Sequence, residues 1–466
     1  MKLKLLGITD KDKFEENIKI VASAGKLSRY PGTVTEVYNK CNDYEKNLSF
    51  IKMVLSLGHE SIIDHDYLVF ALEDVSPIVE QTLIKERFSS FTIKSRREVD
   101  FSNVGYVVPK FKDKNGNLLE NQEKLQGIYK NYMNFLFDGY KKLLDKGIPK
   151  EDARFVLPYS YHSNIIMGFD AHVVKNLIVR FLKGKESKID ELKELGEKML
   201  EIVNDRASYL VDSIEKTDVK QNIKEKLDEK IMGTNYQIID KVNLTSYTSD
   251  VDKQIFISAI MHNYQLSYET AENIYEDKIK DDVNYQKELI KTINEDFDRL
   301  PLTQVNFNFQ IPVSLAVLTH ITRHRTHDIL VPNFVPIGNL NYHLTPPSIK
   351  KNANEFFEEI FKTNVEVYEK FKKLGVRDED LIYFYLSGNL VNIATNMDGK
   401  TLAWILRLRT CNKAQWEFRN IANQMKDLVS EVSTYFPEIL GPDCVVKGYC
   451  PEGKESCGKI KTLKNK

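Results

Sequence analysis

Apolar residues follow two different periods along the chain, and the two periods predict a mixed fold. Runs of β-favouring apolar residues at Tyr67–Leu72 and Val305–Ile311 predict buried strands. In longer stretches the apolar residues recur every three or four positions, which is typical of amphipathic helices. These stretches are 75–86, 123–146, 187–233, 312–323, 354–374 and 412–435. The pattern predicts an α+β fold.

Parts of the chain recur at a period near half its length. The segment Lys85–Arg97 resembles Arg323–Val335, and Gly147–Asp152 is echoed by Gly375–Asp380. Such a period indicates a tandem duplication. Gly233 is expected to end the helical region of the first half. We therefore expect a first repeat at 1–233, a second repeat at 234–440, and a cysteine-rich tail at 441–466.

The composition indicates a globular protein without a strong global charge. The chain has 466 residues, of which 42% are hydrophobic and 29% charged, and its formal net charge is −1. This balance argues against nucleic-acid binding through overall charge. No apolar run reaches the roughly 20 residues of a membrane helix, and the first residues do not resemble a signal peptide. We expect a cytoplasmic protein that does not bind membranes.

The triplet Arg323-His324-Arg325 stands at the predicted end of a helix. Guanidinium groups bind phosphate and pyrophosphate oxygens bidentately, so the triplet suits a nucleotide ligand. The alternative is a solvated basic helix end that is stabilised by the helix dipole. His324 likewise has two interpretations, a ligand contact or a structural cap.

Several motifs, taken in order, resemble the flavin-dependent thymidylate synthases of the ThyX family. Gly58–His65 resembles the family's Gly-His-x-Ser-x-x-Glu-His element. A second element of the family reads Arg-His-Arg-x-x-Ser-x-x-x-x-Ser-x-Arg. The first repeat departs from it at Lys85 and Glu86, and it keeps the third, sixth, eleventh and thirteenth positions, which are Arg87, Ser90, Ser95 and Arg97. The second repeat keeps the first three positions and replaces the later ones with Asp328, Asn333 and Val335.

Three further segments extend the resemblance. Glu151–Pro158 is similar to the family's Glu-x-Ala-Arg-x-x-Leu-Pro, and Leu408–Arg419 is similar to its Leu-Arg…Ala-Gln-Trp-Glu-Ile-Arg. We expect no counterpart of the latter in the first repeat. The flavin element Asn-Ala-Arg-x-x-x-Asn aligns, partly eroded, with Asp170–Asn176 and Asp398–Trp404. The resemblance covers most of 1–180 and 295–458.

The resemblance implies an enzyme that converts dUMP to dTMP with methylene-tetrahydrofolate, NADPH and bound FAD. It implies FAD-binding residues at Ser61, Asp64, His172, Asn176, Arg323, His324 and Arg325. It implies dUMP-binding residues at Ser90, Ser95, Arg97 and Arg154, and a catalytic Arg409 that polarises the uracil.

The two repeats have lost different members of this set, so we expect one composite site to which both contribute. The family's homotetramer would then correspond to a homodimer of this chain, a pseudo-tetramer. The alternative is a catalytically silent homologue that binds nucleotide or nucleic acid.

Four cysteines near the end of the chain suit a structural zinc site. They are Cys411, Cys444, Cys450 and Cys457, and they are accompanied by glycine turns. Some members of the resembled family carry a similar tail. The alternatives are four reduced thiols without a ligand, or an iron–sulfur cluster.

Overall fold

The computed structural model describes residues 1–9, 14–220, 223–231, 237–332 and 340–464. Gly233, Asn333 and Val335 lie outside the described residues. The described residues form two compact units. The first unit is drawn from 1–236, 334–341 and 345–388, and the second from 237–333, 342–344 and 389–466. The predicted domain boundaries of the two repeats and the tail remain a prediction.

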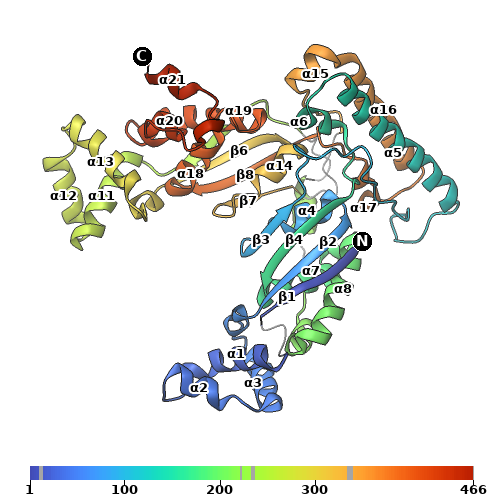
Figure 1. Cartoon of the computed structure of the whole chain (residues 1–466), viewed down its shortest axis with the longest axis horizontal. Helices are drawn as coiled ribbons and strands as arrows, with labels where there is room; N and C mark the ends of the chain where they lie inside the picture. The colour runs from blue at the N-terminus through green and yellow to red at the C-terminus, as the bar shows by residue number, and fades with distance from the viewer. Residues whose placement is uncertain (10–13, 221–222, 232–236, 333–339, 465–466) are drawn as a thin grey trace. The chain divides into compact units, whose positions relative to one another are not determined.

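The first unit contains a four-stranded antiparallel sheet in the order β1-β2-β4-β3. Its strands are β1 (Lys2–Ile8), β2 (Tyr67–Val75), β3 (Ser89–Ile93) and β4 (Ser163–Asp170). Leu68, Phe70 and Leu72 alternate along β2 and are buried, which gives the sheet an apolar face. Helices α7 (Ala171–Lys183) and α8 (Asp190–Arg206) contact the sheet (Figure 1).

The second unit repeats this sheet in the order β5-β6-β8-β7. Its strands are β5 (Asn243–Tyr247), β6 (Asn306–Ser314), β7 (Asp328–Leu330) and β8 (Leu390–Asp398). Ser90 pairs with Gly168 in the first sheet, and Asp328 pairs with Asn396 in the second. The predicted correspondence of 85–97 with 323–335 therefore places Ser90 and Asp328 at the same point of the two sheets, and the predicted α+β fold with two similar units is confirmed.

The helices also follow one order in the two repeats. Those of the first repeat are α1 (Phe14–Leu27), α2 (Val34–Lys40), α3 (Tyr44–Ser56), α4 (Pro77–Leu83), α5 (Gln122–Asp145), α6 (Lys150–Ala153), α7 (Ala171–Lys183), α8 (Asp190–Arg206), α9 (Val211–Lys216) and α10 (Ile223–Ile231). Those of the second repeat and the tail are α11 (Val251–Tyr264), α12 (Tyr268–Lys278), α13 (Val283–Glu295), α14 (Leu315–Ile321), α15 (Pro347–Asn352), α16 (Asn354–Lys373), α17 (Asp378–Leu381), α18 (Gly399–Arg409), α19 (Trp416–Ser430), α20 (Asp443–Val446) and α21 (Lys459–Lys464). The long helix between the third and fourth strands of the first repeat, α5, thus corresponds to α16, and the helix after the fourth strand, α7, corresponds to α18.

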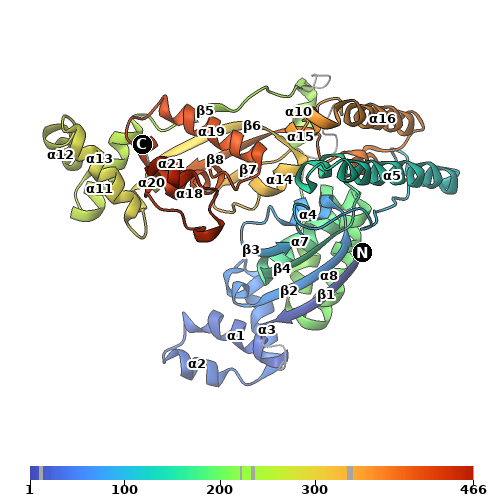
Figure 2. The same cartoon turned by 45° about the horizontal axis from the view of Figure 1, so that its top comes forward.

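The long helices of the two repeats pack against each other within the first unit (Figures 1 and 2). The Tyr132 hydroxyl on α5 donates to Asn364 Oδ1 on α16 at 2.6 Å. Gly139 leaves room for the contact, because a Cβ there would lie 2.9 Å from Ile360 Cδ1. Helix α16 belongs to the second repeat in sequence and to the first unit in space.

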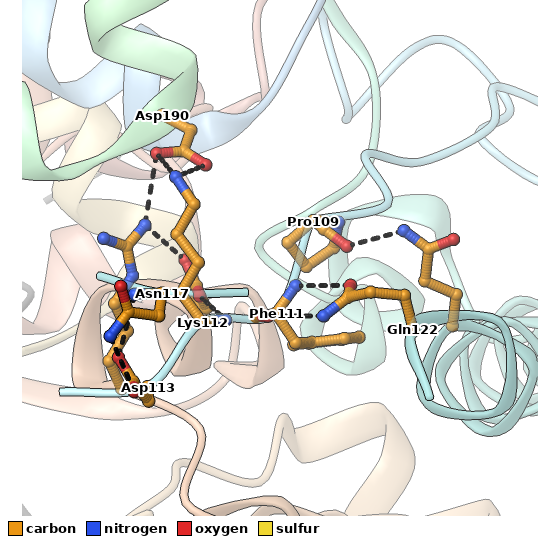
Figure 3. Close-up of polar contacts among 10 residues, drawn as sticks. Pro109, Phe111, Lys112, Asp113, Asn117, Gln122 and Asp190 are labelled. Carbon is orange, nitrogen blue, oxygen red and sulfur yellow. Dashed lines mark hydrogen bonds and ion pairs between the residues drawn. The ribbon is translucent and has the colours of Figure 1, made fainter. Parts of the chain in front are cut away.

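The polar loop before α5 is held by its own hydrogen bonds (Figure 3). Gln122 accepts from the Phe111 N–H at 3.1 Å and donates to the Phe111 carbonyl at 2.6 Å. Lys112 Nζ pairs with Asp190 at 2.7 Å. Gly116 takes a φ of +86° at the turn, a conformation that glycine adopts without steric cost.

Two predicted elements differ from the structure. The stretch 187–233 was predicted as helical throughout, but it is divided into the separate helices α8, α9 and α10. Pro312 was expected to begin a helix, but it lies inside β6, opposite Asn392 of β8. Pairing between β5 and β6 has already ended at Gln310, so the missing N–H of proline disrupts no bond to β5. Among the described residues, no helix is long and apolar enough to cross a membrane.

Candidate functional site

The basic triplet of the second repeat lies in the turn between α14 and β7. Arg323 and Arg325 are exposed, whereas His324 between them is only 3% exposed. The His324 backbone N–H donates to the Ile321 carbonyl at 3.0 Å, which closes the turn after the helix. The turn therefore presents two cations to solvent and directs the imidazole inward.

The buried His324 ring is enclosed by aromatic and cationic groups. Arg409 Nε donates to His324 Nε2 at 2.9 Å. Trp404 and Phe418 approach the ring edge-on, with centroids at 4.9 and 5.9 Å. Burial, followed by the charge of Arg409, lowers the pKa of His324 to about 3. His324 is therefore neutral at physiological pH, and the cations of the triplet are its two arginines.

Arg409, the predicted catalytic residue, ends α18. Its guanidinium carbon lies 4.9 Å from the centroid of the Phe418 ring, and the side chain is half-buried. The hydrogen bond to His324 and the ring of Phe418 fix the guanidinium on one edge. The structure thus brings Arg409 and His324 together, which their separation in sequence did not show.

A buried carboxylate that sequence reasoning missed connects α14 to α19. Glu417 accepts from the Ser314 N–H at 2.7 Å and from its hydroxyl at 2.6 Å. Ser314 in turn caps α14 by accepting from the Val317 N–H at 3.2 Å. We call this pair of contacts the serine–glutamate clasp. Glu417 belongs to the Ala-Gln-Trp-Glu motif, and its place there was the available signal.

The first repeat has the same clasp. Glu191 accepts from the Ser76 N–H at 2.8 Å and from its hydroxyl at 2.6 Å. We expected no counterpart of the C-terminal motif in the first repeat. This expectation is wrong for the glutamate of the motif, whose counterpart is Glu191. Burial raises the pKa of Glu191, which also accepts from the Tyr383 hydroxyl. Counted from this glutamate, the first repeat has Lys188, Ile189, Asp190 and Lys193 at the positions of Ala414, Gln415, Trp416 and Arg419.

The first repeat has an ion-paired acidic residue at the position that His324 occupies in the second. Glu86 stands there and pairs with Arg180 at 2.5 Å, and Arg180 also pairs with Glu186 at 2.9 Å. A pyrophosphate at this position would meet carboxylates. The two repeats thus differ in charge at equivalent places.

Two of the predicted dUMP-binding residues meet around Glu151. Arg97 pairs with its carboxylate at 2.9–3.0 Å, and Arg154 Nε donates to its backbone carbonyl at 3.0 Å. Ser95 accepts from the Arg97 N–H at 3.3 Å. Ser90 lies exposed on β3. The structure therefore gathers three of the four predicted residues, and Arg154 among them is buried.

A second ion pair, which is buried and which the sequence did not reveal, lies beside this group. Arg96 binds Glu80 through two bonds of 3.0 Å, and Ser163 donates to Glu80 at 2.8 Å. Burial, followed by the charge of Arg96, lowers the pKa of Arg154 to about 10. With Arg97 and Glu151 these groups hold three cations and two carboxylates, so an excess of one positive charge suits an anionic ligand. We call them the arginine cluster.

The predicted flavin residues of the first repeat lie on η1 (Ser61–His65) and α7. His172 Nε2 lies 2.9 Å from Glu60, and its Nδ1 lies 3.4 Å from Asp64. Glu60 also pairs with Lys175 and was missed from the sequence. Ser61 and Asn176 are exposed on the same two elements. Asp64 and His172 therefore lie within ion-pair distance of each other.

The cysteine-rich tail contains no formed metal site among the described residues, where no cluster of three or more potential ligands is arranged to hold an ion. The described cysteines also form no disulfide. Burial raises the pKa of Cys444, and Cys411, Cys450 and Cys457 add to the rise. The other three thiols therefore lie near enough to Cys444 to contribute to its raised pKa.

Comparison with known proteins supports both repeats. The family model "Thymidylate synthase complementing protein" (Thy1) matches residues 11–207 and 243–437. A flavin-dependent thymidylate synthase of Clostridium tetani is 29% identical over 48% of this chain and 95% of its own length. One of Geobacter sulfurreducens is 32% identical over 39% of this chain and 75% of its own. A structure of the UMP/dUMP methylase PolB of Streptomyces cacaoi, bound with 5-Br dUMP, covers 44% of this chain and 90% of its own, at 17% identity and a TM-score of 0.36.

Proposed function

Because the chain belongs to the thymidylate synthase complementing protein family, with a match in each repeat, we propose that it is a flavin-dependent thymidylate synthase. The reaction would methylate dUMP reductively to dTMP with methylene-tetrahydrofolate and NADPH. The observation that carries the proposal is the arginine cluster, whose excess positive charge suits a nucleotide phosphate. Relatives about 30% identical are flavin-dependent thymidylate synthases, which supports it.

FAD is the cofactor that the family implies, and the donors of the second repeat suit it. Arg323 and Arg325 are exposed guanidiniums for the pyrophosphate. His324 Nδ1 is a buried polar atom without a hydrogen-bond partner among the described residues, which fits a ligand at this turn. When bound, FAD carries the hydride, and the chain supplies placement and charge. From the first repeat we propose four further contacts: Ser61, Asp64, His172 and Asn176.

For dUMP we propose that Arg97 and Arg154 bind the phosphate together with the hydroxyls of Ser90 and Ser95. Arg97 is already oriented by Glu151, so little ordering is needed on binding. Arg409 would place a fixed positive charge beside the uracil carbonyls, where negative charge develops in the transition state. His324 and Phe418 hold Arg409 and would keep that charge in place.

The proposed site requires residues of both repeats. The second repeat keeps the basic triplet and Arg409, whereas the first keeps the serines and arginines for dUMP. At the place of His324 the first repeat has Glu86, which pairs with Arg180. We therefore propose one functional composite site per pair of repeats, and we propose that the chain forms a homodimer.

Anaerobic flavin oxidation tests the function. Protein reconstituted with FAD is reduced with NADPH, and dUMP and methylene-tetrahydrofolate are then added while the flavin absorbance is followed. Reoxidation with formation of dTMP is expected. If the flavin stays reduced and dTMP is absent, the proposal fails. The alternative of a silent homologue would then be tested by binding of dUMP and of single-stranded DNA.

We also propose one structural zinc ion held by the four C-terminal cysteines. Glycine turns at Gly441, Gly448 and Gly458, all with positive φ, allow the tail to bend back on itself. The contribution of the other three thiols to the raised pKa of Cys444 supports the proposal. The ion would close the tail onto the end of α18, where Cys411 follows Arg409.

A further inference from the structure

Two buried hydrogen-bond donors in the second unit have no partner among the described residues. One is His324 Nδ1 and the other is Gln415 Nε2. The side chains are 3% and 1% exposed, so water is not their ordinary partner. Buried polar atoms in folded proteins are nearly always bonded, and an exception calls for a ligand or an ordered water.

The hydrogen bond from Arg409 decides what His324 can offer. Arg409 Nε donates to His324 Nε2, so Nε2 must carry a lone pair. The neutral ring then has its single proton on Nδ1, which makes Nδ1 a donor. A neutral N–H is a better match for a carbonyl oxygen than for a pyrophosphate, which favours cations.

Gln415 is oriented by the helix that it caps. Its Oε1 accepts from the Phe418 N–H at 2.9 Å at the start of α19. The amide oxygen is thereby used, and the NH₂ group is left as a donor. The Phe418 ring lies 5.9 Å from the His324 ring and 4.9 Å from the Arg409 guanidinium carbon. Gln415, His324 and Arg409 therefore all lie around Phe418.

The first repeat shows that the fold itself does not need these donors. Glu86 stands at the place of His324 and is paired with Arg180. Ile189, which precedes α8 as Gln415 precedes α19, has no polar side-chain atom. The serine–glutamate clasp is present in both repeats, whereas the two buried donors occur only in the second. A role specific to the second repeat explains the difference better than a role in folding.

We infer that His324 and Gln415 donate hydrogen bonds to carbonyl oxygens of a planar ring ligand, and that His324 acts there as a neutral donor. The inference rests on the proposed function and adds Gln415 to its binding residues. Two ring systems of the proposed reaction carry such carbonyls, the isoalloxazine of the flavin and the uracil of dUMP.

The test uses Gln415→Glu in the full-length chain. Glutamate keeps the oxygen that caps α19 and replaces the NH₂ donor with an acceptor. Gln424→Glu is the matched control, because Gln424 lies on α19, the helix that Gln415 caps, and likewise accepts a backbone N–H, that of Val242 at 3.1 Å. Affinities are measured by fluorescence titration for FAD and for riboflavin, which lacks the pyrophosphate, and by calorimetry for dUMP.

If the flavin ring is the ligand, Gln415→Glu weakens FAD and riboflavin by about tenfold and leaves dUMP unchanged. If uracil is the ligand, dUMP is weakened instead. Riboflavin is the informative probe, since a pyrophosphate contact cannot contribute to its binding. Either result supports the inference, provided that Gln424→Glu binds as the wild type does.

Unchanged affinities for all three ligands in Gln415→Glu would overturn the inference. A loss shared equally with Gln424→Glu would overturn it as well, because it would reflect damage to α19. Formation of dTMP by the wild type is assayed in parallel. Ring binding without dTMP would contradict the proposed function alone, whereas dTMP formation with unchanged affinities would contradict only this inference.

Discussion

Acidification should destabilise the second unit, because the folded state holds His324 in its neutral form. The pKa of His324 is lowered from an ordinary 6.5 to about 3 by burial and by Arg409. Below pH 6.5, His324 takes up a proton in the unfolded chain but stays neutral in the folded chain. The free energy of unfolding therefore falls as the pH falls, down to about pH 3. Each pH unit in this window costs about 1.4 kcal/mol. At about pH 5, roughly 1.5 units below the unfolded value, the loss is about 2 kcal/mol relative to neutral pH.

The assay is urea unfolding of flavin-free protein at about pH 7, 6 and 5, compared between the wild type and His324→Asn. The only two tryptophans, Trp404 and Trp416, both lie in the second unit, so their fluorescence reports on that unit. The wild type should lose about 2 kcal/mol more than the variant between the highest and lowest pH. His262→Asn, an exposed position on α11, is the control and should follow the wild type. Equal pH slopes for the wild type and His324→Asn would refute the conclusion that His324 is buried and neutral.

Four further outcomes follow from the proposed site. Arg97→Ala should weaken dUMP binding by the roughly 1.5–3 kcal/mol of a charged hydrogen bond, and an unchanged calorimetric Kd would contradict its role. Arg323→Ala should lose FAD on gel filtration while Lys85→Ala keeps it, and equal loss in both would contradict the asymmetry of the repeats. Elemental analysis should find about one zinc ion per chain, lost in Cys444→Ser, and metal-free protein purified without chelator would exclude the zinc site. Light scattering should give a dimer, and a monodisperse monomer at about micromolar concentration would count against it.

Local periodicity was sufficient to predict most of the elements. The stretch 123–146 became α5 (Gln122–Asp145), and 354–374 became α16 (Asn354–Lys373). The run Tyr67–Leu72 became β2, extended by three residues to Val75. Pro312 was misassigned because its tolerance in β6 depends on where the neighbouring strand ends, and that is a property of the sheet.

The sequence predicted which residues belong to the site better than it predicted their ion pairs and charge states. Arg97 and Arg154 were found from motif order, and the structure brings both to Glu151. The Glu80–Arg96 pair carries no local signal, because its partners meet only after β3 and α4 have packed. The neutral state of His324 likewise depends on tertiary burial, so a sequence that reads as three basic residues contains two permanent cations.

Because α16 packs onto α5, the protein cannot be divided between its two repeats without separating these helices. A fragment ending near 233 would contain α5 but lack α16, and the Tyr132–Asn364 bond and the face around Gly139 would be exposed to water. A fragment beginning there would carry α16 with no helix to cover it. The second repeat thus contributes residues 345–388 to the first unit, whereas the first repeat contributes no element to the second. Each fragment alone is therefore expected to aggregate. The two fragments are expected to reassemble when they are co-expressed, so the chain could serve as a split-protein reporter.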